Sequence, residues 1–349
     1  LWKVHGIFYD LAGFVQNHPG GALAINLGRG RDCTAMFESY HPFTERNRTV
    51  LVKYAFVPPK VEGLKSGLQS IGNVGGIDAV EPLRGKKLTS SKAGLPSRGE
   101  ADPFYQLLCE RAEFALREVG MDPRQSPTCV KATPGRLAYY ALTLVTVALT
   151  YLGYIRGSYP GSSLLFAMAA WLLGAMGHDG GHFAVAGSSA PWLDSLAGLG
   201  MSLISSPFLW MHQHTYAHHS FTNDVHCDPD LHHFTRFLRT HPLIQEFVSY
   251  RMQVYRLYVY MCYTLTVLGE TLWIPLNLLL TGDIYGVMPV PMPQSTRWFS
   301  SRLYGAAQVS HLLLFTLAIV VAPLVYGGGT GALMTYLALS GLLFGLFSQ

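Results

Sequence analysis

The sequence predicts a chain of two parts: a small α+β domain at the N-terminus, followed by an all-α membrane domain with four transmembrane helices and additional interfacial helices. Of the 349 residues, 49% are hydrophobic and only 13% are charged, against about 25% charged in an ordinary soluble domain. Uncharged stretches long enough to cross a bilayer begin after residue 136. Residues 1–58 instead alternate short β-like runs with turns marked by glycine and aspartate, which is typical of a small mixed domain.

The first domain is predicted to span residues 1–58. Residues 59–101 are rich in glycine, serine and lysine and hold few large apolar side chains; because such a segment buries too little surface to fold alone, we expect a flexible linker. Asp102 and Pro103 then indicate the N-cap and first position of a helix. We expect this helix to lie on the membrane surface, at the start of a second domain covering residues 102–349.

Four transmembrane spans are predicted from uncharged apolar stretches. Residues 137–155 and 157–177 hold 19 and 21 residues without a charge, each about the length that crosses a hydrocarbon core. Residues 303–349 hold no Asp, Glu, Lys or Arg. This last stretch is long enough for two spans, separated at the glycines 327–329.

Two further apolar stretches do not fit a simple span. The stretch 195–211 is short for a transmembrane span, and the stretch 257–282 carries Glu270 near its middle. A carboxylate at the bilayer centre costs about 2.5–3.5 kcal/mol on insertion scales. We therefore expect both stretches to be interfacial or re-entrant.

The basic residues predict the orientation of the membrane domain. With four spans, Arg156 lies on one side of the membrane, and most other basic residues of this domain lie on the opposite side. These are Lys131, Arg136, Arg236, Arg239, Arg251, Arg256, Arg297 and Arg302. The positive-inside rule makes the side with the excess cytoplasmic.

Charge and cysteine usage exclude other classes of protein. The net charge of +4 comes without a long basic run, which argues against nucleic-acid binding. The five cysteines are scattered, so neither a disulfide framework nor a thiolate metal site is indicated, and a reducing compartment is expected. The chain begins without Met and stops inside an apolar run. We expect both natural ends to lie outside this sequence.

A pair of histidines in the first domain suggests a haem site. His18 opens the tetrapeptide His-Pro-Gly-Gly, and His41 follows 23 residues later. Two histidines from separate elements can occupy both axial positions of one haem iron, which suits it to single-electron transfer, and the glycines allow the backbone to approach a flat porphyrin. The alternative is that the tetrapeptide forms only a turn and that His41 is a capping or surface residue.

The surroundings of this pair resemble the cytochrome b5 family over nearly all of residues 1–58. The resemblance is carried by the following residues: Trp2, Gly6 to Leu11, Phe14, the His18 tetrapeptide, Gly30 to Thr34, and Val52 to Tyr54. It implies a domain that binds haem b through His18 and His41.

Ten of the fourteen histidines lie between His178 and His241. His178 and His182 form one HxxxH box, and His214, His218 and His219 form a second, HxxxHH. An i, i+4 pair lies on one face of a helix and can bind one metal ion, while the adjacent third histidine can serve a second ion. Imidazole suits iron, copper or zinc; the alternative for a single box is a hydrogen-bonded interfacial pair. Both boxes can build one site only on the same membrane side, so residues 195–211, too short to cross twice, should not span.

The boxes and their flanks resemble the front-end acyl desaturases that carry a fused cytochrome b5. The matching segments are HDGGHFA from His178 and QHTYAHHSFTN from Gln213, followed by Asp228-Pro229-Asp230. In that family a third box of the QxxHH type completes a di-iron centre; here it would lie beyond Gln349, so this piece is expected to be inactive. The resemblance assigns five iron ligands: His178, His182, His214, His218 and His219. The Phe-Ala after box one and the HxxxHH form of box two look more like Δ5 or Δ4 members than Δ6 members.

The resemblance implies an O2-dependent enzyme, an acyl-lipid or acyl-CoA desaturase, that introduces a double bond into a long-chain polyunsaturated acyl chain. Electrons would come from the fused haem domain and, ultimately, from NADH through a separate cytochrome b5 reductase. We expect a multi-pass protein of the endoplasmic reticulum, surrounded by membrane lipid, with haem domain and boxes facing the cytoplasm. The alternatives are a sphingoid-base desaturase, a fatty-acid hydroxylase with fused cytochrome b5, or a membrane-anchored haem electron carrier.

Other residues near the boxes have subordinate interpretations. Asp179, Asp228 and Asp230 could orient ligand imidazoles, or the last two could cap a turn. His212 is a candidate for contacting a metal ligand without binding the metal itself, and His311 is expected to pack inside its helix bundle. A polar loop role is expected for His226, His232, His233 and His241.

Overall fold

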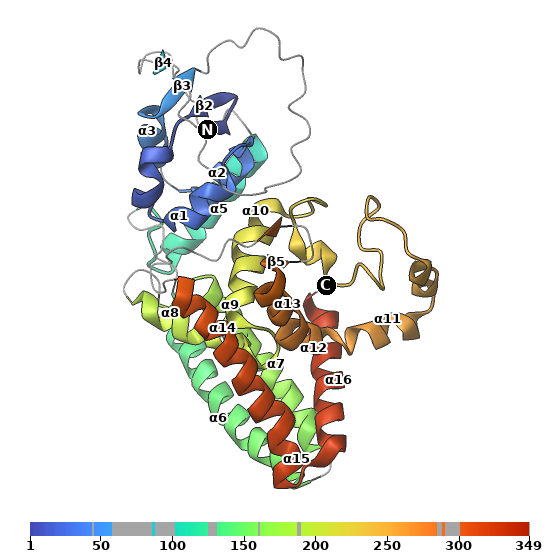
Figure 1. Cartoon of the computed structure of the whole chain (residues 1–349). Helices are drawn as coiled ribbons and strands as arrows, with labels where there is room; N and C mark the ends of the chain where they lie inside the picture. Colours follow the sequence, from blue (N-terminus) through green and yellow to red (C-terminus); the bar gives the residue numbers. More distant parts are fainter. Residues whose placement is uncertain are drawn as a thin grey trace. The chain divides into compact units, whose positions relative to one another are not determined.

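The computed structural model describes residues 1–43, 45–57, 86–87, 102–124, 131–159, 161–186, 190–284, 288–289 and 301–348 (Figure 1). The chain divides into two compact units, Leu1–Val130 and Lys131–Gln349. This division falls later than the predicted boundary at residue 101, and the predicted domain limits stay predictions. The predicted linker lies outside the described residues, apart from Lys86 and Lys87.

The N-terminal unit contains a small antiparallel sheet with the strand order β1-β2-β3-β4. Its strands are β1 (Trp2–Val4), β2 (Ile7–Tyr9), β3 (Ala55–Val57) and β4 (Lys86–Lys87). Trp2 pairs with Tyr9, and Phe8 pairs with Phe56. Both Trp2 and Tyr9 are buried in the core of this unit together with Val4, Leu11 and Leu51. Apolar residues from the two ends of the domain sequence therefore form one core, which supports the helices that carry His18 and His41.

Short helices complete this unit. They are the 3₁₀ helix η1 (Ala12–Asn17) and the α-helices α1 (Gly21–Leu27), α2 (Thr34–Tyr40), α3 (Arg46–Val52) and α5 (Pro103–Glu118). The predicted cap of α5 is confirmed, because the Asp102 carboxylate accepts hydrogen bonds from the backbone N–H groups of Phe104 and Tyr105 at 3.0 and 3.2 Å. The Tyr105 hydroxyl donates to the carbonyl of Glu38 at 3.0 Å, so α5 contacts the end of α2.

The second unit is built on a bundle of long helices that run side by side in Figure 1. These are α6 (Pro134–Arg156), α7 (Ser162–Gly181), α14 (Ser301–Phe315), which continues through the π-helical turn η8 (Thr316–Val321) into α15 (Ala322–Tyr326), and α16 (Gly329–Ser348). Phe166 of α7 stacks between Tyr154 and Tyr336, with 4.9 Å between ring centroids on each side. The Tyr154 hydroxyl donates to the carbonyl of Ile319 at 2.6 Å. Aromatic packing with satisfied hydroxyl groups thus joins the helices.

Short elements pack against the C-terminal half of α7. They are α8 (Pro191–Gly198), η3 (Leu199–Leu203), α9 (Pro207–Trp210), the π-helix η4 (Met211–His218), α10 (His219–Phe221) and η5 (Pro229–His232). A Cβ atom on Gly177 would lie 2.3 Å from the backbone nitrogen of Met201, and one on Gly180 would lie 2.3 Å from that of Gly198. Only glycine permits this backbone approach, which places α8 and η3 directly against α7.

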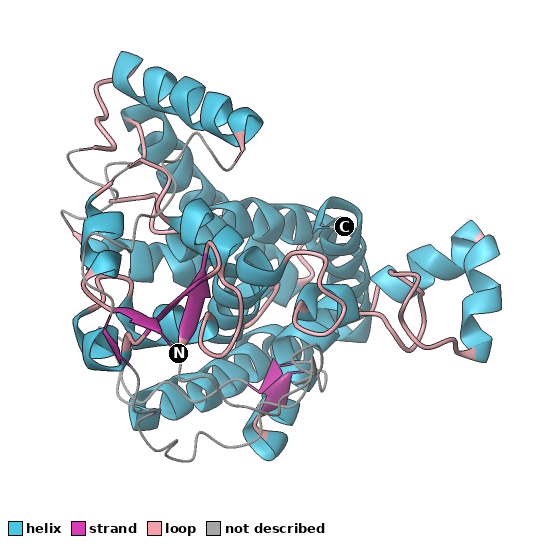
Figure 2. Ribbon diagram, turned by 90° about the horizontal axis from the view of Figure 1, so that it is seen from above, coloured by secondary structure: helices cyan, strands magenta, loops and turns pink. Residues whose placement is uncertain are grey.

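The chain then leaves the bundle and returns to it. The elements are η6 (Val248–Val254), α11 (Arg256–Tyr263), α12 (Thr266–Leu268), the π-helical turn η7 (Gly269–Trp273), α13 (Ile274–Thr281) and the strand pair β5 (Asp283–Ile284) and β6 (Met288–Pro289). Figures 1 and 2 both show α11 extending outward from the bundle. Cβ atoms on Gly341 and Gly345 of α16 would lie 2.5 Å from Thr264 and Tyr263, so this segment packs against the C-terminal turns of α16.

Four described helices are long and apolar enough to cross a membrane, which agrees with the predicted number. They are Pro134–Arg156, Arg256–Thr281, Gly305–Tyr326 and Gly329–Phe347. Three correspond to predicted spans. Helix α7, over the predicted span 157–177, is not among them, because its last turn carries the polar residues His178 and Asp179; it nevertheless runs beside α6 and α16. Segment Arg256–Thr281 qualifies by length and composition, so its interfacial placement stays a prediction.

Candidate functional site

His18 and His41 lie opposite each other in the N-terminal unit. His18 follows η1, and His41 follows the last residue of α2. Their ring centroids are 6.3 Å apart, with 84° between the ring planes. Because a metal–imidazole bond is about 2 Å long, both rings can bind the same iron ion.

Hydrogen bonds select which nitrogen of each ring is available. The Nδ1 atom of His41 lies 2.7 Å from the carbonyl oxygen of Phe37, and that of His18 lies 3.3 Å from the carbonyl oxygen of Gly21. When each Nδ1–H donates to its carbonyl, Nε2 is the nitrogen of each ring whose lone pair can bind a metal. Burial lowers the pKa of both imidazoles, and the charge of His41 lowers that of His18 further. A lowered pKa favours the neutral imidazole, which is the form that binds a metal.

The tetrapeptide beside His18 allows this arrangement. A Cβ atom on Gly20 would lie 2.9 Å from Cε1 of His18, and Gly21 has φ +86°, which L side chains rarely adopt. The ring of Phe14 meets that of His18 edge-on at 6.0 Å, and Phe37 packs against His41 at 4.9 Å. The donor set and its apolar surroundings fit a haem.

The first histidine box lies at the C-terminal end of α7. The rings of His178 and His182 are 4.6 Å apart between centroids, one above the other as the i, i+4 spacing predicts. Gly181 lies against the neighbouring element, because a Cβ there would lie 2.4 Å from the ring of Trp210. The Thr215 hydroxyl donates to the carbonyl of Gly181 at 3.3 Å. Box one is thereby held against box two.

The second box occupies the π-helix η4 and the first residue of α10. The rings of His214 and His218 stack at 5.2 Å with 16° between their planes. The wider π-helical turn also brings His219, five residues after His214, to the same side: the Nε2 atoms of His214 and His219 are 3.2 Å apart. The α-helical spacing assumed from the sequence does not predict this contact. π-Helical turns often occur at functional sites.

The two boxes converge, so that the five predicted iron ligands form one cluster. The metal-binding atoms of His178, His182 and His214 all lie within 4.8 Å of one another, and a second such group is His214, His218 and Asp230. The ring of His219 lies 4.8 Å from that of His182. His214 belongs to both groups. The first group offers only imidazoles, which suit iron, whereas the second includes the Asp230 carboxylate. The cluster is therefore a candidate centre for two metal ions.

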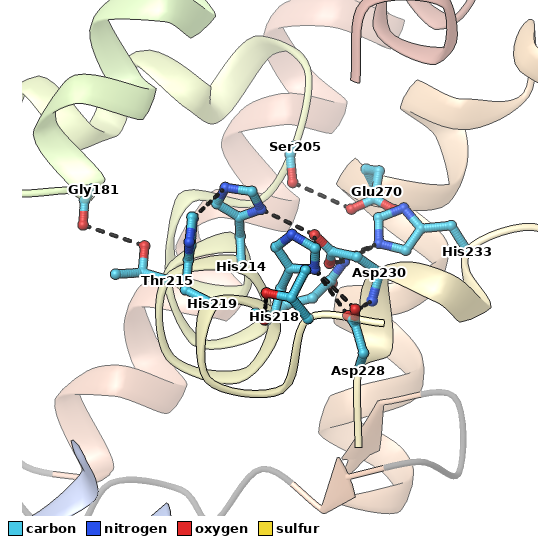
Figure 3. A network of polar contacts seen from close by, with 12 residues as sticks. Gly181, Ser205, His214, Thr215, His218, His219, Asp228, Asp230, His233 and Glu270 are labelled. Atoms are coloured by element: carbon cyan, nitrogen blue, oxygen red, sulfur yellow. Dashed lines mark hydrogen bonds and ion pairs between the residues drawn. The ribbon is translucent and has the colours of Figure 1, made fainter. Parts of the chain in front are cut away.

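Two carboxylates orient the rings of box two (Figure 3). The Nδ1 atom of His218 lies 3.0 Å from Asp228, and the Nδ1 atom of His214 lies 3.0 Å from Oδ2 of Asp230. Both Nε2 atoms are thus directed to the cluster, as in many metal sites. The hydrogen bond to Asp228 raises the pKa of His218; burial opposes a charge on Asp230, but its hydrogen bonds to His214 and His233 lower its pKa. Asp228 also accepts from the backbone N–H groups of Asn223 and Asp230 at 2.8 and 2.9 Å, so it both orients a ligand and caps a turn.

Asp179 has a different main partner from the one suggested by the sequence. Its Oδ2 atom accepts from Nη2 and Nε of Arg136 at 2.7 and 3.0 Å and from the hydroxyl of Tyr140. Its other oxygen is 3.7 Å from Nδ1 of His178, too far for a strong hydrogen bond. Asp179 chiefly joins α7 to α6.

Two residues at the cluster are absent from the sequence prediction. The indole of Trp210 stacks on the ring of His214 at 4.5 Å with 21° between planes and lies 5.3 Å from that of His178. Its position four residues before His214 is a signal that sequence reasoning could have used. His233, expected in a polar loop role, lies half-buried between Asp230 and Glu270, with contacts of 3.3 and 3.1 Å. Burial lowers its pKa, but the charge of Glu270 and the hydrogen bond to Asp230 outweigh this and raise it to about 9.

The remaining histidines of this region do not join the cluster. His212 is buried and packs against Tyr216 at 5.7 Å between ring centroids, and the Nε2 atom of His232 contacts the carbonyl oxygen of Val225 at 2.9 Å. His311 is buried in α14 and packs against Phe315 at 6.1 Å. Of the described cysteines, Cys33, Cys109, Cys227 and Cys262 form no disulfide bond.

Two family models match the chain. The model described as fatty acid desaturase matches residues 157–349, which is more than half of the chain. The model described as cytochrome b5-like heme/steroid binding domain matches residues 1–56. The first range includes both histidine boxes, and the second includes His18 and His41.

Several curated proteins are similar to this chain. An acyl-lipid omega-13 desaturase of Chlamydomonas reinhardtii is 30% identical over 247 residues, covering 69% of this chain and 49% of the relative. A probable Delta(5) fatty acid desaturase C of Dictyostelium discoideum is 25% identical, covering 66% and 44%, and an acyl-lipid (8-3)-desaturase of Physcomitrium patens is 30% identical, covering 65% and 42%. The chain thus spans about half the length of these relatives or less. No solved structure matches it.

Proposed function

This chain belongs to the fatty acid desaturase family and carries a cytochrome b5-like domain at its N-terminus, and from this premise we propose that the whole protein desaturates long-chain polyunsaturated acyl chains with O2. The new double bond is placed between an existing one and the carboxyl end. Relatives named as Delta(5) and (8-3) desaturases support this regioselectivity. The acyl group is carried by a membrane lipid or by coenzyme A.

The observation that carries the proposal is the convergence of the two boxes. His178, His182, His214, His218 and His219 come from two separate helical segments, yet their rings lie together. In box two, carboxylates hold Nδ1 of His214 and His218, so that Nε2 is the free donor. A hydrogen-bonded histidine pair at the membrane interface would not require the two boxes to meet, and it would not require one nitrogen of each ring to be selected.

These five histidines would hold two iron ions. An unactivated C–H bond offers no acidic or basic handle, so side chains alone cannot remove hydrogen from adjacent methylenes; a di-iron centre with O2 supplies the required oxidising power, and a haem supplies electrons one at a time. The protein's own contribution is orientation. Asp228 and Asp230 fix the tautomer and direction of two imidazoles, and Trp210 restrains the ring of His214 by stacking.

The N-terminal unit would supply the electrons. His18 and His41 would hold the haem iron through their Nε2 atoms, and the haem would pass electrons one at a time. The haem domain is covalently joined to the desaturase domain, and this raises its effective concentration near the boxes. NADH is the ultimate donor, through a separate cytochrome b5 reductase.

The apolar helices place the reaction at a membrane. Four helices can span a bilayer by length and composition, and an acyl tail dissolved in lipid can reach the boxes while its head group remains at the surface. The excess of basic residues on the side of the boxes supports a cytoplasmic position for them, by the positive-inside rule. We assign the protein to the endoplasmic reticulum in that orientation.

The proposal is tested with the full-length protein expressed in yeast that is fed defined polyunsaturated acids. Double-bond positions are located by mass spectrometry in the wild type and in His182→Ala and His218→Ala, with His226→Ala, an exposed histidine outside the cluster, as the control. We expect a new double bond on the carboxyl side, lost in the first two variants and kept in the control. Hydroxylated or sphingoid products would overturn the proposal, and a protein that binds haem but yields no new double bond would favour a haem electron carrier.

A further inference from the structure

Glu270 is a buried carboxylate within an otherwise apolar segment. Its side chain is 2% exposed and belongs to the π-helical turn η7 between α12 and α13. Oε1 lies 3.1 Å from Nδ1 of His233, and Oε2 accepts from the hydroxyl of Ser205 at 3.4 Å. A charge in such a place is normally paired or functional.

His233 extends this contact toward the candidate iron site. Its Nε2 atom lies 3.3 Å from Oδ1 of Asp230 and also contacts the amide of Gln213, which donates to the same oxygen at 3.1 Å. The two nitrogens of one imidazole therefore contact two different carboxylates. Figure 3 shows the resulting line of side chains from Glu270 through His233 to Asp230 and His214.

The two carboxylate oxygens of Asp230 have different partners. Oδ1 contacts His233 and Gln213, whereas Oδ2 lies 3.0 Å from Nδ1 of His214 and 3.5 Å from Nδ1 of His218. A carboxylate held at one oxygen cannot rotate freely, so its other oxygen keeps its direction. The orientation of His214 thus depends on what holds Oδ1.

We propose that Glu270 and His233 are positioning residues for the iron centre, which hold Asp230 so that Nε2 of His214 faces the metal position. This inference rests on the proposed function, because it requires His214 to be an iron ligand. Stability alone explains the pair poorly, since replacing a buried ion pair by apolar residues is often neutral or stabilising. The contact between Glu270 and His233 also joins η7 to box two. The backbone carbonyl of Glu270 is itself held, because it accepts a hydrogen bond from the backbone N–H of Ser206 at 3.2 Å.

The test measures iron affinity of the purified full-length protein in detergent by chelator titration, with iron content determined by elemental analysis. Variants Glu270→Ala and His233→Gln should each weaken iron binding by about tenfold or more, the range found for partners of metal ligands. Glu270→Gln keeps an acceptor for His233 and should lose less. The control Tyr336→Phe removes another buried hydrogen bond, to the carbonyl of Leu203 at 2.7 Å, and should lower thermal stability while leaving iron affinity unchanged.

A double-mutant cycle separates one linked chain from two independent effects. The variant carrying both Glu270→Gln and His233→Gln should bind iron no more weakly than His233→Gln alone, because the same link is already broken. Thermal unfolding in detergent reports that the second unit of each protein is folded, and the haem absorption measures the haem iron to be subtracted from the total. If Glu270→Ala does not fold, the polar variants carry the test. Iron affinity at the wild-type value in folded His233→Gln overturns the inference. A wild type that binds no iron, or a His214→Ala variant that binds it equally well, refutes instead the proposed function.

Discussion

The Nδ1 atom of His218 lies 3.0 Å from the carboxylate of Asp228, which is completely buried. The tautomer of His218, a histidine of the second box, is thus selected by the protein itself. The same relation recurs between His214 and Asp230. Because one nitrogen of each ring is engaged, the other is the only one that a metal can use.

Replacement of Asp228 by Asn should weaken iron binding by about 10- to 100-fold, because the amide holds Nδ1 of His218 less strongly than the carboxylate. Chelator titration of the purified protein measures the change. Asp224→Asn is the matched control, since Asp224 is exposed in the same loop and caps only the N–H of His226 at 2.8 Å. Equal iron affinity in the two variants would show that Asp228 serves the turn alone.

Replacement of His41 by Ala should abolish the haem absorption of a bis-histidine site while iron at the boxes is retained, because the two sites use separate ligands. Visible spectra of the oxidised and reduced protein measure the first, and elemental analysis measures the second. His5→Gln is the control, because the Nε2 atom of His5 contacts the carboxylate of Glu38 at 2.7 Å and not the imidazoles of His18 and His41. An unchanged haem spectrum in His41→Ala would contradict the assignment.

Replacement of Gly177 by Ala should lower the free energy of unfolding by about 1–3 kcal/mol, as overpacking does. The new Cβ would lie 2.3 Å from the backbone nitrogen of Met201, and backbone cannot move aside as a flexible side chain can. Thermal unfolding in detergent measures the loss. Gly135→Ala, where nothing lies within 4 Å of the added Cβ, should be neutral or slightly stabilising because alanine favours helix. Equal unfolding temperatures for the two variants would exclude a close approach at Gly177.

The thiol of Cys33 should resist alkylation at pH 7 to 9. Burial, together with the charge of Asp32, raises its pKa to about 11; since the thiolate is the nucleophile, its population at pH 8 is about a thousandth of the total and grows as pH rises toward 11. Mass spectrometry of the folded protein after iodoacetamide treatment compares Cys33 with the less buried Cys227. Labelling of Cys33 at the rate of Cys227 would mean that the thiol is accessible and ionised.

The sequence by itself determined the membrane class, the number of candidate spans, and the two sets of histidines. These features are local: an uncharged run has the length of a bilayer, and a ligand pair has the period of a helix. The N-cap at Asp102 was predictable for the same reason, because a cap and its helix are adjacent in the chain. Local patterns also contained Trp210, at helical spacing from His214, although its stacking was not anticipated.

Only the tertiary structure decided which groups complete the site. Hydrophobic periodicity does not report the π-helical turn that brings His219 to His214. Glu270 and His233 are far apart in sequence, and no local pattern relates them: the first is a charge in an apolar stretch, and the second was expected in a polar loop role. Their contact exists because the chain folds back over box two. No local pattern encodes this contact, because it requires two distant segments to pack against each other.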